Sequence, residues 1–308
     1  MPQHFEIPFE SDFENSKLIQ DRDALRKTIV EDPDAPSIQQ LLDSPSYKIA
    51  FEDKDFIMSG NSRSVRLELE TVKPERTLQY WGIRSTVIVF GSARTLSGDR
   101  ATKNLRAAEA KAEMFSDDKQ IQNELAIAKQ NYEMSQYYEL AREFGKVVTA
   151  ANKQPDPKGR YDYVICTGGG PGIMEAANRG AHEAGGLSVG LNIQLPYEQH
   201  PNPYITPQLC FQFHYFAIRK LHFMLRAKAL VAGPGGFGTL DELFEALTLR
   251  QTQRMQEIPI ILFGEKFWRK IINFDYLVET GVIDQKDLGL FYFTESPTDA
   301  WKHIRDFR

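Results

Sequence analysis

A glycine-rich run between an apolar strand and a helix is the feature that most constrains this chain of 308 residues. Residues 229–232, Ala-Leu-Val-Ala, are typical of a buried strand, and Gly-Pro-Gly-Gly-Phe-Gly follows at 233–238. Glycines let backbone N–H groups approach an anion closely, and a helix that begins near Thr239 adds its unpaired amides and the positive end of its dipole. The run therefore predicts a phosphate cradle, with Glu242, one turn into the helix, facing the bound group.

A second glycine loop follows another apolar strand upstream. Residues 163–166 lead into Thr167-Gly-Gly-Gly-Pro-Gly172, and a helical stretch continues to His182. The carboxyl ends of parallel strands gather at one edge of an open α/β sheet, where ligands bind, so two such turns indicate one shared site. We expect a nucleotide or a sugar phosphate as the ligand.

Strand-like and helical segments alternate through most of the chain. This alternation predicts an α/β fold, a Rossmann-like doubly wound parallel sheet with helices on both faces. The expected strands are 85–90, 163–166, 187–193, 209–213, 229–232, 258–263 and 290–293. The expected helices are 172–184, 215–228, 239–253, 266–280 and 297–307, with one or two long helices within 100–154.

Two segments stand apart from this alternation. Residues 1–79 are polar and acidic and predict an N-terminal extension, with a helix over 16–30 and extended structure near 65–69. Residues 80–308 are expected to form the Rossmann-like domain, with a helical insertion at about 96–135.

Composition excludes several classes of partner. The net charge of -5 leaves no basic stripe for nucleic acid, and we expect neither a nucleic-acid nor a membrane partner. The amino terminus lacks the pattern of a signal peptide, so a cytoplasmic protein is expected. Cys166 and Cys210 lie in apolar segments, and the six histidines form no zinc pattern, so we predict no metal site and no cofactor.

Two common glycine motifs do not fit. A Walker loop needs a lysine after its last glycine, and Gly238 is followed by Thr239 and Leu240. The dinucleotide fingerprint needs a third glycine where Ile173 stands and an acidic residue where the next strand ends in Asn192. Nucleoside triphosphate hydrolysis and NAD binding are therefore disfavoured.

Three segments together, 167–180, 213–226 and 234–242, resemble the LONELY GUY (LOG) family, which also carries the label "lysine decarboxylase-like". Its PGGxGTxxE motif is complete at 234–242, and an Arg-Lys pair stands at 219–220. The resemblance covers about residues 80–308 and is closest to bacterial-type members with an N-terminal extension. It implies a Rossmann-like homodimer or higher homo-oligomer that cleaves the N-glycosidic bond of nucleoside 5'-monophosphates to free base and ribose 5-phosphate.

The family's functional residues carry over onto this chain by motif. Arg219 and Glu242 match the catalytic pair. The expected phosphate- and substrate-binding positions are Ser92, Gly169, Gly170, Lys220, Gly235, Gly236, Gly238 and Thr239. AMP or a related purine nucleotide, cytokinin nucleotides included, is the implied substrate. In the oxocarbenium-like reaction Glu242 would activate water or stabilise the sugar cation, while Arg219 would face the phosphate or the departing base.

Other interpretations stay open at this point. Thr239-Leu-Asp-Glu242 also fits a capping box, in which the glutamate only bonds back to the start of its helix. Arg219 and Lys220 fit solvated charges on a helix. A non-enzymatic nucleotide or molybdenum cofactor carrier is the second functional candidate. An amino acid decarboxylase is the third, disfavoured because no lysine stands in a pyridoxal phosphate motif.

Overall fold

The computed structural model describes residues 38–196 and 200–307. The chain divides into two compact units, residues 1–72 and 73–308, at a point inside helix α4 (Arg63–Tyr80). The first unit contains, among its described residues, the short helices α2 (Ile38–Leu42) and α3 (Lys54–Met58) and the 3₁₀ turns η1 (Pro45–Tyr47) and η2 (Gly60–Ser62). The helix predicted over 16–30 lies outside the described residues.

The extended structure predicted near 65–69 is wrong, because these residues belong to α4. Val65, Leu69 and Val72 recur at the spacing of one helical face, although they are partly exposed. The β-branched valines favour a strand locally, and the surrounding Arg, Glu and Leu residues outweigh that preference.

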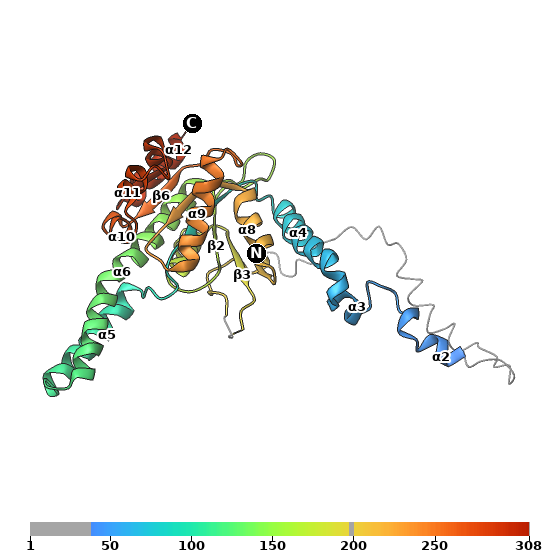
Figure 1. Ribbon diagram of the computed structural model, residues 1–308, viewed down its shortest axis with the longest axis horizontal. Helices are drawn as coiled ribbons and strands as arrows, with labels where there is room; N and C mark the ends of the chain where they lie inside the picture. Colours follow the sequence, from blue (N-terminus) through green and yellow to red (C-terminus); the bar gives the residue numbers. More distant parts are fainter. Residues whose placement is uncertain (1–37, 197–199, 308) are drawn as a thin grey trace. The chain divides into compact units, whose positions relative to one another are not determined.

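A seven-stranded, all-parallel sheet forms the centre of the second unit (Figure 1). Its spatial order is β4-β3-β2-β1-β5-β6-β7, so the chain first builds outward from β1 and then returns to add β5 on the other side of β1. The strands are β1 (Thr86–Phe90), β2 (Val164–Thr167), β3 (Ser188–Ile193), β4 (Cys210–Phe213), β5 (Ala227–Ala232), β6 (Ile260–Phe263) and β7 (Phe291–Thr294). The doubly wound fold predicted from the alternation is confirmed.

Two hydrophobic layers hold helices against the two faces of this sheet. Alternate residues of β1 point to opposite sides, with Val87 and Val89 in one layer and Ile88 and Phe90 in the other. The first layer packs α6 (Lys119–Asn152), α7 (Ile173–Glu183) and α12 (Pro297–Asp306) on the sheet. The second packs the end of α4 with α8 (Phe216–Leu225), α9 (Phe237–Gln251), α10 (Glu265–Ile271) and α11 (Phe274–Glu279).

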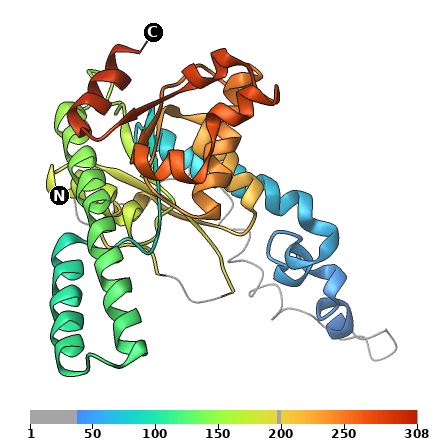
Figure 2. The same ribbon diagram turned by 60° about the vertical axis from the view of Figure 1, so that its left-hand side comes forward.

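The segment predicted as a helical insertion, about 96–135, contains α5 (Gly98–Met114) and the first half of the long helix α6. Helix α5 packs along α6, and the pair projects beyond the sheet in both views (Figures 1 and 2). Where one helix was expected over 266–280, the chain forms α10 and α11, because the Asn273 side chain accepts a hydrogen bond from Tyr276 N and caps a new helix. Two 3₁₀ helices, η3 (Pro207–Leu209) and η4 (Gln285–Leu290), complete the described elements.

No helix in the described ranges combines the length and apolar character needed to cross a membrane.

Candidate active site

Three loops meet at the carboxyl ends of β1, β2 and β5, where the strand order reverses. Gly233 N donates to Phe90 O and Ser92 N donates to Pro234 O, each at 2.9 Å, while Ile173 N donates to Ser92 O at 3.1 Å. These backbone bonds join the loop after β1 to the two glycine-rich loops. The two predicted glycine turns therefore lie at one site, as the topological switch point of an open α/β sheet requires.

Close backbone contact at this junction explains one of the glycines. Gly172 has a φ of 73°, and a Cβ atom there would lie 2.2 Å from Ser92 O. Both features make any other residue at position 172 destabilising.

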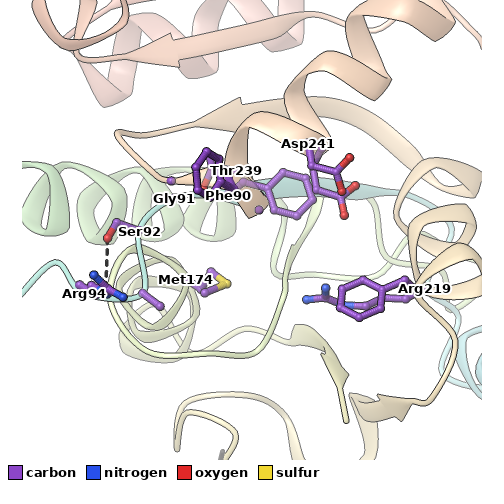
Figure 3. Close-up of a pocket in the computed structure, with 14 residues that line it drawn as sticks. Phe90, Gly91, Ser92, Arg94, Met174, Arg219, Thr239 and Asp241 are labelled. Atoms are coloured by element: carbon purple, nitrogen blue, oxygen red, sulfur yellow. Dashed lines mark hydrogen bonds between the residues drawn. The ribbon is translucent and has the colours of Figure 1, made fainter. Parts of the chain in front are cut away.

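A cleft of about 590 Å³ opens beside the junction (Figure 3). In the close-up, Ser92 and Arg94 stand on one side, Arg219 and Asp241 on the other, and Met174 between them. Six of the predicted site residues line this cleft: Ser92, Arg219, Gly236, Gly238, Thr239 and Glu242. Its remaining lining residues are Phe90, Gly91, Ala93, Arg94, Met174, Phe216, Phe237 and Asp241.

The amino end of α9 presents bare amides to the cleft. The helix begins at Phe237 with Gly236 as its N-cap, and no side chain caps it. The N–H groups of Phe237, Gly238 and Thr239 find no acceptor among the described residues, and the first bond of the helix runs from Leu240 N to Gly236 O. Such a helix start is suited to an anion because of its free donors and its dipole.

The glycines at 235, 236 and 238 differ in whether the surrounding protein leaves room for a side chain. A Cβ at Gly235 would lie 2.1 Å from Thr239 Oγ1, so the protein itself demands glycine there. A Cβ at Gly236 or Gly238 would meet no protein atom within 4 Å, and neither residue has a positive φ. The fold does not require glycine at these two positions, and the absence of side chains there leaves the backbone open to close approach from the cleft.

Arg219 on α8 is held in place by backbone carbonyls. Its Nε donates to Leu191 O at 2.7 Å, its Nη2 lies 3.4 Å from Gly168 O, and its guanidinium lies 5.2 Å from the centre of the Phe223 ring. Burial lowers the pKa of this guanidinium, and the Glu242 carboxylate opposes that effect. Arginine stays charged through such shifts, so Arg219 is a fixed cation at the edge of the cleft.

Glu242 is a buried carboxylate that the protein leaves unpaired. The residue is only 5% exposed to solvent. Its Oε2 atom has no hydrogen-bond partner in the part of the chain that the structure describes. Burial raises the pKa of Glu242 to about 7; Lys220 and Arg219 act against this, and Glu245 and Asp241 act with it. A carboxyl group poised near neutrality beside a cleft is typical of general acid–base catalysis.

The capping-box interpretation of Glu242 is wrong. A capping box would make Thr239 the N-cap, whereas α9 begins two residues earlier and is capped by Gly236. Because Thr239 already lies inside the helix, Thr239 and Glu242 cannot cap the unpaired N–H groups at the start of the helix in the way a capping box does. Glu242 therefore lies inside α9 and takes no part in capping its start.

Lys220 lies outside the cleft. Its Nζ forms ion pairs of 2.9 Å with Asp241 Oδ1 and with Glu245 Oε2 on α9. It lines a separate apolar groove of about 530 Å³ between α8 and α9.

Gly169 and Gly170 stand behind the cleft rather than in its wall. Gly169 N donates to Thr167 Oγ1 at 3.0 Å, and the carbonyls of Gly169 and Gly170 accept from Asn202 N at 2.8 Å and Asn202 Nδ2 at 3.1 Å. Gly169 has a φ of 74°, and the Asn192 amide occupies the space of its missing Cβ. This loop is bonded within the protein and supports the carbonyl of Gly168 that faces Arg219.

Arg94 and Met174 also line the cleft, and neither is among the site residues predicted from the sequence. Arg94 lies on the rim of the cleft, and its N–H donates to Ser92 Oγ at 3.1 Å. A cation four residues after a buried strand, in a Gly-Ser-Ala-Arg turn, was a usable signal, because that turn begins at the ligand edge of the sheet. Met174 had no such signal, since a methionine in an amphipathic helix fits the core equally well.

Comparison with known proteins finds a matching family model and a distant relative. A family model described as "Possible lysine decarboxylase" matches residues 174–304, which include Arg219 and the whole run from Gly233 to Glu242. Over this segment the chain is similar to the LOG family. A probable cytokinin riboside 5'-monophosphate phosphoribohydrolase of Oryza sativa subsp. japonica is 22% identical over 174 residues, 56% of this chain and 66% of that relative.

Solved structures with some likeness to this chain include two molybdenum cofactor proteins. The molybdenum cofactor binding protein of Rippkaea orientalis is 19% identical, with a TM-score of 0.41, over 55% of this chain and 86% of that one. The Moco carrier protein of Chlamydomonas reinhardtii is 20% identical, also with a TM-score of 0.41, over 72% and 96%. At these scores the fold assignment stands on the strand order itself.

The buried carboxyl group predicts an unusual pH dependence of stability. Between about pH 4.5, the ordinary pKa of a glutamate, and pH 7, the unfolded chain loses a proton that folded Glu242 keeps. The free energy of unfolding therefore falls as the pH rises through this window. Glu242→Gln removes the cost of ionisation, so we expect it to be more stable than the wild type at pH 8, by up to about 3 kcal/mol, and little different at pH 4.

Urea denaturation at both pH values measures this difference. A loss of stability of the same size at pH 4 and pH 8 would mean that Glu242 has a structural partner after all.

Proposed function

We propose that this protein hydrolyses the N-glycosidic bond of a nucleoside 5'-monophosphate, AMP or a related purine nucleotide, and releases the free base and ribose 5-phosphate. The observation that carries the proposal is the buried, unpaired Oε2 atom of Glu242, one turn along the helix whose bare amides face the same cleft. A phosphate-binding helix start and a carboxylate near neutrality are what hydrolysis of a phosphorylated nucleoside needs.

Each group has a distinct part in the reaction. The amides of Phe237, Gly238 and Thr239 receive the 5'-phosphate and hold the sugar next to Glu242. Because the transition state resembles an oxocarbenium ion, the Glu242 carboxylate stabilises the sugar or takes a proton from the attacking water. Arg219, fixed by two carbonyls, offers positive charge to the phosphate or to the departing base without having to reorganise.

Several domain and site assignments belong to this proposal. Residues 80–308 act as the catalytic domain, residues 1–79 are an extension, and the helical insertion covers about 96–135. Ser92 and Thr239 supply polar contacts from the cleft wall, and Gly169 and Gly170 act by supporting it.

A carrier of a phosphorylated cofactor is the alternative function. Such a protein needs the bare amides but has no use for a carboxylate whose pKa burial raises to about 7. Glu242 therefore favours the enzyme over the carrier.

Phosphate dependence tests the proposal directly. We expect the full-length protein to release adenine from AMP, and to act on adenosine at least about 100-fold more slowly in kcat/KM, because charge-assisted bonds to the phosphate supply several kcal/mol. Chromatographic assay of free base against time measures both rates. Binding of AMP without any release of base would point to the carrier, and equal rates on AMP and adenosine would contradict the phosphate site.

Gly238→Ala provides a matched variant for this test. Its methyl group meets no protein atom and suits a helix, so folding should be unimpaired or improved by up to about 1 kcal/mol. Because Gly238 lines the cleft at the start of α9, the same methyl group should hinder the phosphate, so KM for AMP should rise while the slow reaction of adenosine is unchanged.

We also propose that two copies associate through α8 and α9. Large apolar side chains on these helices are exposed, Phe237 at 92% and Phe216, Leu221, Leu225 and Phe244 between 40% and 54%. The groove beside Lys220 carries Phe237 and Phe244, and Phe237 also reaches the cleft. A second copy seated here would cover apolar surface and close the rim of the cleft.

Light scattering checks this association. At micromolar concentration we expect at least a dimer of the 35.2 kDa chain and a shift toward monomer in Phe244→Asp. Met114→Asp, which changes a residue 74% exposed on the α5–α6 hairpin, is the control and should not alter the mass. A wild-type monomer across this range would refute the proposal, since an interface of ordinary size survives such dilution.

A further inference from the structure

Lys220 forms ion pairs with the turn of α9 that carries Glu242. Its ammonium group lies 2.9 Å from both Asp241 Oδ1 and Glu245 Oε2, and its side chain is 19% exposed. Asp241 directly precedes Glu242, and Glu245 follows it by three residues, so the two partners flank Glu242 on one helical turn. The lysine thus ties α8 to α9 at the level of the proposed catalytic carboxylate.

Among the residues that the structure describes, the charged groups that shift the pKa of Glu242 lie on α8 and α9. Arg219 and Lys220 face it from α8, and Asp241 and Glu245 accompany it on α9. Two cations therefore balance three carboxylates that lie within one turn. Removing Lys220 would leave these three carboxylates with the single charge of Arg219, whose Nε is already bonded to Leu191 O. Like charges this close on a helix repel, and the repulsion is strongest for the buried group.

We propose that Lys220 is a positioning residue: its two ion pairs hold the Glu242 turn against α8 and favour the carboxylate form of Glu242, and Lys220 does not touch the nucleotide. This inference rests on the proposed function of the same site. It replaces the expectation that Lys220 binds the phosphate, because the ammonium group lies in the groove between the helices and not in the cleft.

The direction of each charge effect agrees with this role. After burial, which raises the pKa of Glu242, Lys220 is the largest influence and lowers it, while Glu245 and Asp241 raise it. Loss of Lys220 and loss of Asp241 should therefore move the ionisation of Glu242 in opposite directions. A lysine that only stabilised the fold would produce no such opposition.

The pH dependence of kcat/KM for AMP distinguishes these cases. In Lys220→Met we expect the acidic limb to move up by about one pH unit, a tenfold loss of rate at pH 6 that largely disappears by pH 9. Lys220→Arg should restore the wild-type profile, and Asp241→Asn should move the limb to lower pH. KM for AMP should change less than about twofold in all three variants. A loss in Lys220→Met that is uniform over pH, or that comes from a raised KM, would overturn the proposal.

A second measurement does not depend on catalysis. Carbon-13 NMR of glutamate-labelled, full-length protein follows the Glu242 carboxyl signal, assigned by its absence in Glu242→Gln. Its midpoint should rise in Lys220→Met and fall in Asp241→Asn. These shifts without any release of base would sustain the role of Lys220 and reject the hydrolase. Unchanged midpoints would reject the role of Lys220 whether or not the protein is an enzyme.

Asp241→Asn keeps the proposal testable if Lys220→Met fails to fold. Its side chain is 61% exposed, so the substitution should leave the fold intact even if Lys220→Met does not fold. A midpoint that fails to fall in Asp241→Asn would then contradict the proposal on its own.

Discussion

The backbone hydrogen bonds between the β1 and β5 loops are the constraint on which the rest of the site depends. They form because β5 returns to the side of β1 opposite β2, which brings two strand ends together with no strand between them. Ser92 N and Gly233 N are satisfied by carbonyls across this junction, so the loops need no side chains there to hold them. The path of residues 233–236 follows from these bonds, and with it the residue at which α9 begins.

The start of α9 in turn decides the chemistry of the cleft. Because the helix begins at Phe237, its free amides and the Glu242 side chain belong to the same element and keep a fixed separation. Burial of Glu242 then raises its pKa, and the cations of α8 limit the rise. The site therefore combines a buried carboxyl group, which lowers the stability of the fold when it ionises, with nearby cations that reduce this loss, as functional sites often do.

Local patterns in the sequence predicted the fold and the position of the glycine-rich loops well. Apolar strands that alternate with helical periods, and glycines at strand ends, depend on neighbouring residues only, and both features are present in the structure. The break between α10 and α11 was missed, although Asn273 is a recognisable cap. The helix over 65–69 was missed because valines weigh toward strand when their surroundings are ignored.

The environment of the charged side chains could not be predicted in the same way. The Thr239–Glu242 pattern fits a capping box letter by letter, and only the tertiary bonds of the loop show that the helix starts earlier. Likewise, an Arg-Lys pair does not reveal that one cation borders the cleft and the other faces Asp241 and Glu245 on the next helix. Such partners depend on the register between α8 and α9, which no local pattern contains.

The central claim is that the protein buries Glu242 for catalysis, and one comparison tests it most directly. Release of adenine from AMP should fall by about 10²-fold to 10⁴-fold in Glu242→Gln, because an amide can neither accept a proton from water nor offer a full charge to the sugar cation. Calorimetric titration should show that AMP still binds to this variant with an affinity close to that of the wild type. Near-normal turnover in Glu242→Gln would contradict the account.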